Sequence, residues 1–406
     1  MNQLSIDQLL PHLQLLDDRQ DLMLQQVIQL CDVNSGTRNL AGLEVVAQQL
    51  AGLFESLGGQ LQLVDSVPEK RLNSRGKLLD APLGKSIHIV KRPEAKHKVL
   101  LCIHMDTVYQ HDNLFQKCVM RDDGTLNGPG VADAKGGIVV MLHALQALEA
   151  SPLAEHIGWE VLLNPDEEIG SPSSRPLIDS IAPRCDFGLL FEPALGDNQL
   201  VSWRKGSGNF SLLVRGRSAH AGRAFAEGRN ALVAAAKVVQ AISDLNTDPE
   251  VTFNVARIDG GSPMNVVPDL AIVRANVRVR TADEQVAVEQ QLKAVAAKFS
   301  ELDGIEASLH GGFRSPPKPI TPEMEVVMQR IEKCGASLGV DVKWQGTGGA
   351  SDGNKFAAAG LPNIDSMGPC GGRIHSDEEF LVVESLVPRA KLAALVLLDF
   401  AMSRTR

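Results

Sequence analysis

Cysteine, aromatic residues and positive charge are all scarce in this chain of 406 residues. The six cysteines are scattered and form no C-x-x-C pair, which argues against a disulfide framework and against a zinc site made of thiolates. Aromatic residues make up 4% of the chain, and the formal net charge is −9. A general nucleic-acid-binding protein needs a basic surface and aromatic stacking platforms, so the composition excludes a nucleic-acid partner.

The sequence also lacks a long hydrophobic run. Its longest apolar stretches, residues 392–398 and 137–142, are far shorter than the roughly 20 residues that cross a bilayer. The N-terminal segment MNQLSIDQLLPHLQLLDD has neither the basic start nor the continuous apolar core of a secretory signal. We therefore predict a soluble, cytoplasmic protein without a membrane partner, and its length suits two or three domains.

The N-terminal half alternates predicted helices with short apolar strands. Helical periodicity covers residues 22–31 and 43–57, and a third helix is predicted over residues 136–149. Three continuous apolar runs have the composition of strands buried on both faces: 99–103, 159–163 and 187–191. This alternation is typical of an α/β domain with a mostly parallel central sheet.

The pattern changes at Arg204 and returns to α/β character after the proline-rich segment 315–319. Between these points the expected elements follow the order β-α-β-β-α-β, the ferredoxin-like split motif: 209–217, 230–243, 251–258, 269–280, 283–299 and 304–310. We therefore predict a discontinuous main domain, residues 1–203 and 317–406, with an inserted ferredoxin-like α+β domain, residues 204–316.

The charge of the inserted segment differs from that of the rest of the chain. It carries two more basic than acidic residues, whereas the remainder has a net charge of −11. A mildly basic lid over an acidic site would suit an anionic substrate. The edge of its predicted sheet could also pair with a second copy of the chain, so we expect a homodimer.

Side chains able to bind a metal follow each of the three buried strands. His104 and Asp106 come after the first, Glu167 and Glu168 after the second, and Glu192 after the third. The carboxyl ends of parallel strands line the ligand crevice of an open α/β sheet, so these groups should converge. Any one of them alone would more often be a helix cap or a solvated loop residue. Their shared position favours a site.

The spacing within each pair suggests a division of roles. His104 and Asp106 are two residues apart, so they face the same side of an extended chain. Asp106 could accept a hydrogen bond from the imidazole of His104 and leave its other nitrogen free for zinc. Glu167 and Glu168 are adjacent and point in different directions. One could bind metal while the other stays free as a base.

Two further candidates lie in glycine-rich loops. Asp133 stands in NGPGVADAKGG just ahead of a helix, where an Asp alone would more often cap that helix. The flanking glycines imply an unusual, closely approached backbone. His375 stands in GGRIHSD. Together with His104 and the carboxylates at the strand ends, and with one carboxylate bridging, these residues make a ligand set for two zinc ions.

At this point the chain resembles a known family. The motifs HMD, GPGVADAKGG, NPDEEIG, FEPA, GRSAHAG, SPMNVVPD and GRIHSDEEF look like the successive motifs of the di-zinc peptidase family. That family contains glutamate carboxypeptidases, aminoacylases, acetylornithine deacetylase and succinyl-diaminopimelate desuccinylase. The resemblance implies that residues 1–203 and 317–406 form a catalytic zinc-peptidase domain and that residues 204–316 form its lid and dimerisation domain.

The resemblance also implies a role for each candidate. Asp133 would bridge two zinc ions, with cobalt as a possible substitute, and four residues would complete the ligand set: His104 and Glu192 on one ion, Glu168 and His375 on the other. Glu167 falls on the family's general base, and Asp106 on the carboxylate that orients the histidine. The peptide bond after the bridging aspartate is cis in this family, so a cis bond is expected between Asp133 and Ala134.

The chemistry implied is hydrolysis of an amide bond. Two zinc ions activate a water molecule that bridges them and polarise the scissile carbonyl, while Glu167 carries the proton to the leaving nitrogen. In the lid, His220 matches a histidine that reaches into the partner subunit's site and stabilises the oxyanion. Asn265 and Arg278 match residues that bind the substrate carboxylate, and Arg314 matches a further arginine of the glutamate carboxypeptidases.

These matches are closest to the glutamate carboxypeptidases of the carboxypeptidase G type. We therefore expect an exopeptidase that releases a C-terminal amino acid, glutamate in the first instance, from a small peptide or an N-acyl amino acid. An N-acyl-amino-acid deacylase shares the same zinc chemistry and stays open as an alternative. A non-catalytic amino-acid-binding protein is a more remote alternative, because the ligand set is complete.

A serine hydrolase is a further alternative. The segment Gly349–Gly353 fits the pattern G-x-S-x-G around Ser351, and Asp365 and His375 follow in the order of an α/β-hydrolase triad. A nucleophile elbow should directly follow a buried strand. The residues ahead of Ser351 are instead polar and glycine-rich, which argues against this reading.

Overall fold

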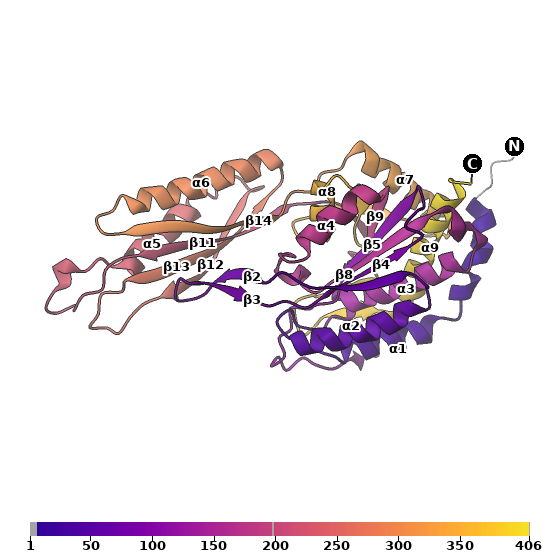
Figure 1. Cartoon of the computed structure of the whole chain (residues 1–406), viewed down its shortest axis with the longest axis horizontal. Helices are drawn as coiled ribbons and strands as arrows, with labels where there is room; N and C mark the ends of the chain where they lie inside the picture. Colours follow the sequence, from indigo (N-terminus) through magenta and orange to yellow (C-terminus); the bar gives the residue numbers. More distant parts are fainter. Residues whose placement is uncertain (1–5, 197–198, 406) are drawn as a thin grey trace.

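The computed structural model describes residues 6–196 and 199–405. It has two main bodies, which lie side by side along the long axis of the molecule (Figure 1). One is a six-stranded sheet with helices on both faces, and the other is a four-stranded sheet with two helices on one face. The predicted fold class, an α/β domain with an added α+β domain, is confirmed.

The larger sheet has the strand order β1-β4-β8-β5-β9-β16. Strands β8, β5, β9 and β16 run parallel to one another, whereas β1 and β4 are antiparallel additions at one edge. The sheet is therefore mostly parallel, as predicted, but the antiparallel edge was not foreseen. The strand bounds are β1 Gln60–Val64, β4 Ser86–Lys91, β5 Lys98–His104, β8 Gly158–Asn164, β9 Phe187–Leu190 and β16 Asn363–Ile364.

Side chains of the central strand β5 alternate between the two faces of this sheet. Leu101 and Ile103 belong to the large hydrophobic core on one face, and Leu100 and Cys102 belong to a smaller core on the other. Helices contribute to both cores: α1 Gln20–Cys31, α2 Leu40–Glu55, α3 Gly136–Glu149, α7 Pro322–Ser337 and α9 Leu386–Met402 to the large core, α4 Arg175–Ile181 and α8 Asp352–Ala358 to the small one.

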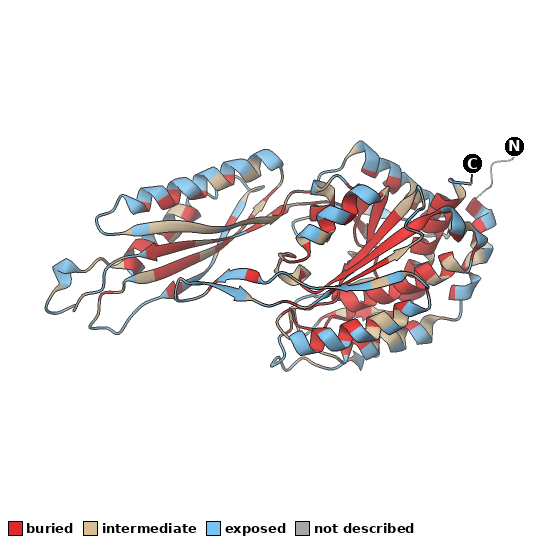
Figure 2. Cartoon of the chain, viewed as in Figure 1, coloured by how far each residue is buried: buried red, intermediate tan, exposed pale blue. Residues whose placement is uncertain are grey.

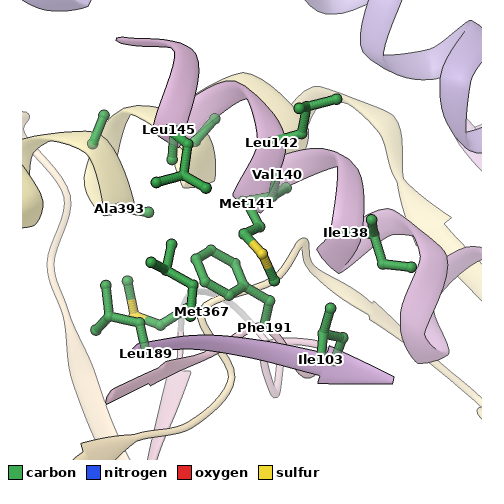
Figure 3. Close-up of a cluster of buried hydrophobic side chains, with 14 of the residues drawn as sticks. Ile103, Ile138, Val140, Met141, Leu142, Leu145, Leu189, Phe191, Met367 and Ala393 are labelled. Atoms are coloured by element: carbon green, nitrogen blue, oxygen red, sulfur yellow. The ribbon is translucent and has the colours of Figure 1, made fainter. Parts of the chain in front are cut away.

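Helix α3 lies at the centre of the large core. Figure 3 shows its side chains Ile138 and Met141 facing Ile103 and Phe191 of the sheet layer. The segment Val131–Glu149 is long and apolar enough to cross a membrane by composition alone, but 94% of it is buried inside the protein. Figure 2 shows the same concentration of buried residues on the central strands and on the helix faces beside them. This segment is therefore a core helix.

The smaller sheet has the order β12-β13-β11-β14, and every pairing in it is antiparallel. This is the strand order of the ferredoxin-like motif, and helices α5 and α6 share one hydrophobic core with it. Strand β14 extends five residues beyond the predicted end at His310, so Arg314 lies within the strand. The bounds are β11 Gly206–Arg215, α5 Ala231–Ser243, β12 Thr252–Gly260, β13 Leu270–Val279, α6 Ala282–Ser300 and β14 Glu306–Ser315.

The chain enters and leaves this lid through two neighbouring segments. The backbone of Arg204 exchanges two hydrogen bonds with that of Lys318, at 3.1 and 3.0 Å. The predicted limits of the inserted domain, 203/204 and 316/317, both lie next to this pair of hydrogen bonds. The limits themselves remain predictions. Short strands complete the structure: the hairpin β2 Glu69–Leu72 and β3 Leu78–Ala81, the pair β10 Gln199–Arg204 and β15 Lys343–Thr347, and the sheet of β6 Val119–Met120, β7 Thr125–Asn127, β17 Gly371–Gly372 and β18 Phe380–Val382.

Candidate active site

His104 ends strand β5, and both of its ring nitrogens have close partners. Nδ1 lies 2.9 Å from the main-chain oxygen of Asp106, so this nitrogen donates to a carbonyl. Nε2 lies 2.9 Å from Oδ1 of Asp133 and 3.8 Å from Oε2 of Glu192. If a metal ion is bound and the proton is on Nδ1, the lone pair of Nε2 would face a cation shared with these two carboxylates, which is the orientation of a metal ligand.

The carboxylate of Asp106 connects His104 to the glutamate turn. Its Oδ1 lies 3.4 Å from Nδ1 of His104, so the main-chain oxygen, rather than the predicted carboxylate, makes the shorter contact. The carboxylate accepts the N–H groups of Glu167 at 3.1 Å and Glu168 at 3.3 Å. It also accepts the hydroxyl of Thr37 at 2.6 Å. These bonds occupy the carboxylate and fix the turn that carries both glutamates.

Asp133 lies in the turn that precedes helix α3. The cis peptide bond expected between Asp133 and Ala134 is present. Oδ2 of Asp133 lies 3.2 Å from Nε2 of His375, while Oδ1 faces His104. Burial alone would raise the pKa of Asp133, but hydrogen bonds from the two histidines hold it well below its usual range. The carboxylate therefore stands ionised between two imidazoles, one at each oxygen.

A second buried carboxylate, Glu379, holds this turn through hydrogen bonds to its main chain. Its Oε1 accepts the N–H groups of Ala132 and Asp133, both at 3.0 Å, and its Oε2 accepts the N–H of Gly130 at 3.2 Å. The hydroxyl of Tyr109 lies 2.7 Å from the same Oε2. Neither Glu379 nor Tyr109 was predicted as a site residue from the sequence. The place of Glu379 in the motif GRIHSDEEF is the signal that could have identified it.

His375 lies in the loop between β17 and β18, with a left-handed backbone (φ 63°) that is uncommon for residues other than glycine. The hydroxyl of Tyr109 lies 2.8 Å from the carbonyl of Ser376, which supports this loop. Nε2 of His375 lies 3.3 Å from Oε2 of Glu168. Hydrogen bonds to Asp133 and Glu168 raise the pKa of His375 to about 10. The imidazole is thus directed at two carboxylates.

The donor groups at this centre fit a divalent metal ion. His104, Asp133 and Glu168 each offer one ligand atom, and these atoms lie within 4.8 Å of one another. Oε1 of Glu168 is buried and has no hydrogen-bond partner among the residues that the structure describes. A buried carboxylate oxygen without a partner is costly, and a cation would satisfy it. Imidazole nitrogens combined with carboxylate oxygens are typical zinc ligands.

A cavity of about 420 Å³ opens over the centre, and Glu167 forms part of its wall. Burial raises the pKa of Glu167 well above its ordinary value, despite the opposing charge of Lys355. Two of the predicted substrate residues line the same cavity from the lid. Arg278 donates to the side chain of Asn276 at 2.9 Å, and Arg314 donates to a main-chain oxygen of the glutamate turn at 2.7 Å.

The other two predicted lid residues do not reach this cavity within the same chain. His220 and Asn265 are exposed and lie in the loops 216–230 and 261–269, which meet where the N–H of Ala221 donates to the carbonyl of Asn265. These loops follow β11 and precede β13, at the opposite end of the sheet from the chain crossings. Figure 1 shows this end as the part of the lid farthest from the six-stranded sheet.

Ser351 is placed for a structural role. It is 1% exposed, and its hydroxyl accepts an N–H at the start of helix α8 at 3.0 Å. The same hydroxyl lies 3.0 Å from Asp365, which forms ion pairs with Arg204 and Lys318. His375 faces the carboxylates of the metal centre instead. The serine hydrolase alternative is therefore wrong, because its three residues do not form a triad.

The buried His104 and buried carboxylates gather at the carboxyl ends of a mostly parallel sheet, together with the more exposed His375 from a neighbouring loop. Next to a smaller α+β domain, this arrangement defines a metal-dependent hydrolase. The family model described as peptidase family M20/M25/M40 matches residues 100–399. The chain belongs to this family and is a metallopeptidase-type hydrolase of amide bonds. The resemblance stated from the motifs is confirmed.

Individual relatives agree with this assignment. The chain is 29% identical over 405 residues to carboxypeptidase G2 of Pseudomonas sp. (strain RS-16), which covers 95% of this chain and 91% of that protein. It is 30% identical over 298 residues to succinyl-diaminopimelate desuccinylase of Bordetella parapertussis, covering 68% and 76%. The structure of the di-peptidase Dug1p from Saccharomyces cerevisiae has a TM-score of 0.77 at 14% identity, covering 98% and 99%, and so shares the fold.

Proposed function

We propose that this protein is a two-zinc exopeptidase that hydrolyses the amide bond to a C-terminal amino acid, in particular glutamate. The observation that carries the proposal is the position of Asp133 between His104 and His375, with one carboxylate oxygen facing each imidazole. Glu192 and Glu168 would complete the sites on the two sides. When bound, the ions polarise the scissile carbonyl and lower the pKa of a water molecule.

Glu167 is the proposed general base. It lines the cavity beside the metal-binding carboxylates, and the hydrogen bond from its N–H to Asp106 fixes its turn. Burial raises the pKa of its carboxyl well above the ordinary value, which makes the carboxylate a stronger base. Glu167 would take a proton from the attacking water and deliver it to the leaving nitrogen.

Two arginines of the lid support an anionic substrate. Arg278 and Arg314 line the cavity that contains the metal centre, and the planar guanidinium group suits bidentate recognition of a carboxylate. Similarity to carboxypeptidase G2 over nearly the whole chain supports release of a C-terminal amino acid, and the resemblance of the motifs to those of glutamate carboxypeptidases favours glutamate. Similarity to succinyl-diaminopimelate desuccinylase supports the alternative, deacylation of an N-acyl amino acid. Both alternatives use the same metal centre and Glu167.

The exposed positions of His220 and Asn265 support a homodimer. Both lie at the end of the lid away from this chain's own cavity, so a second copy would have to bring them to an active site. Mixing inactive His220→Ala and Glu167→Ala proteins tests this proposal. Mixed dimers would contain one intact site and recover part of the activity, whereas independent monomers would recover none.

The substrate and the metal are tested together. We expect a chelator to abolish turnover, and zinc or cobalt to restore it. Liquid chromatography should then show faster release of glutamate from peptidyl and N-acyl glutamates than turnover of acetylornithine or succinyl-diaminopimelate. The reverse preference would select the deacylase alternative. A metal content near zero in natively purified protein would favour an amino-acid-binding role.

A further inference from the structure

The hairpin of strands β2 and β3 extends from the catalytic domain to the lid (Figure 1). Leu72 at the end of β2 shares a small hydrophobic cluster with Leu213 of strand β11. Arg274 of the lid donates to the carbonyl of Leu72, and Arg215 donates to the carbonyl of Gly76, both at 3.1 Å. The hairpin is thus docked on the lid sheet, on the face opposite helices α5 and α6.

A second cavity of about 510 Å³ lies between this hairpin, the lid and the catalytic domain. It continues the cleft over the metal centre, because four residues belong to the linings of both cavities: Glu168, Ile169, Asn209 and Arg314. Glu168 is one of the residues proposed to bind metal. The hairpin cavity therefore begins at the reacting centre and extends along a different direction from the Arg278 side of the cleft.

The lining of the hairpin cavity is rich in positive charge: Arg38, Lys70, Arg71, Arg274 and Arg314. Its carboxylate Glu69 is already neutralised, since it lies between Arg38 and Arg314. Burial works against ionisation of Glu69, but these two arginines hold its pKa below the ordinary value. Among the described residues, the only other carboxylate in this lining, Glu168, belongs to the metal centre.

Arg274 is paired with Asp259, but two other arginines of this lining have donor groups without a partner in the described part of the chain. Arg71 is exposed and forms no ion pair within residues 6–196 and 199–405. Nη1 of Arg38 is buried without a hydrogen-bond partner in the same part of the chain. Lys70 faces Asp80 across the hairpin at 3.7 Å, but both side chains are largely exposed, where such a pair contributes little. An anion in the cavity would find donors that the protein itself does not satisfy.

We propose that the hairpin cavity binds a carboxylate group carried by the acyl portion of the substrate. This inference rests on the proposed amide hydrolysis and adds a second point of recognition to it. The Arg278 side of the cleft would hold the C-terminal amino acid, and the hairpin would hold an acidic group on the other side of the scissile bond. The preferred substrates are then acidic at both ends.

Two matched substrates test this inference. One is N-glutaryl-glutamate, and the other is the same compound with the terminal carboxylate of the glutaryl group changed to a primary amide. We expect the wild-type protein to prefer the acid, by a ratio of kcat/KM of about tenfold or more, since a guanidinium–carboxylate pair is charge-assisted. The double variant Lys70→Gln with Arg71→Gln should lose most of that preference through a higher KM for the acid.

The control is Arg75→Gln, at the tip of the same hairpin and outside the cavity lining. It should keep the wild-type ratio. Binding of glutarate to the zinc-loaded protein, measured by calorimetry, gives a readout that needs no turnover. It should weaken in the double variant and not in the control.

The outcomes separate this inference from the proposed function. If both compounds are hydrolysed at equal rates and the double variant binds glutarate like the wild type, the cavity assignment is wrong and the amide hydrolase stands. If neither compound is hydrolysed but glutarate binding depends on Lys70 and Arg71, the anion site stands and the exopeptidase proposal is wrong. Circular dichroism of the double variant verifies that it is folded.

Discussion

Glu379 accepts the backbone N–H of Asp133 at 3.0 Å, so two buried carboxylates lie on opposite sides of one short turn. Burial and the nearby charge of Asp133 raise the pKa of Glu379 to about 6. Hydrogen bonds from the turn and from Tyr109 compensate the buried charge. Asp133 is therefore positioned by a second carboxylate that does not line the substrate cavity.

Glu379→Gln should weaken metal binding. The amide oxygen of Gln can accept two of the N–H groups, but its NH2 group would then face the N–H of Gly130 and the hydroxyl of Tyr109, which both point at Oε2. Loss of such supporting hydrogen bonds costs about 10–100-fold in metal affinity. Competition with a chromophoric chelator measures it. Glu378→Gln is the control, because Glu378 is exposed. Equal affinities of the two variants would contradict the role of Glu379.

The parts of the fold that could be predicted from the sequence are those with local signals. Strands β5, β8 and β9 are buried on both faces, so they read as continuous apolar runs. The edge strand β1 and the hairpin strand β3 are mostly exposed, so neither forms the long continuous apolar run by which the buried strands were predicted. The hairpin was therefore not predicted, although its residues line the cavity of about 510 Å³.

In the candidate site too, only the residues with a local signal in the sequence could be predicted. His104 and Glu192 could be placed together because they lie at the carboxyl ends of two parallel strands of one sheet. Glu379 was missed because its partner Asp133 is 246 positions away in the sequence, and no local pattern reports such a hydrogen bond. The spacing identified Asp106 as the partner of His104, but it could not distinguish the carboxylate of Asp106 from its main-chain carbonyl, which makes the shorter contact.

Glu167→Ala should abolish turnover and leave the metal content near that of the wild type. Loss of a general base reduces kcat by about 10²–10⁴-fold, whereas the centre of His104 and Asp133 does not depend on this side chain. Steady-state kinetics and elemental analysis are measured on the same preparation. Glu168→Ala is the comparison, and it should lose metal as well as activity. A Glu167→Ala protein with wild-type kcat would show that another group is the base.

Ser351→Ala should reduce stability but retain turnover. The hydroxyl caps helix α8 and contacts Asp365, and loss of an N-cap costs about 1 kcal/mol. Urea denaturation gives the stability, and kcat gives the activity. A serine-directed phosphonate should have no effect on the wild type, whereas a chelator should inactivate it. Complete loss of activity in a folded Ser351→Ala protein would revive the serine hydrolase alternative.

His143 should make the stability depend on pH. It is buried in helix α3, where Nε2 contacts Oε1 of Gln26 at 2.8 Å, and burial, assisted by Arg19, lowers its pKa from 6.5 to about 4. The unfolded chain then binds more protons between these values, so stability is full above pH 6.5 and falls toward pH 4, by at most about 3 kcal/mol. Urea denaturation across this range should show a flatter curve for His143→Gln. The exposed control His156→Gln should keep the wild-type curve, and identical curves for both variants would contradict the assignment.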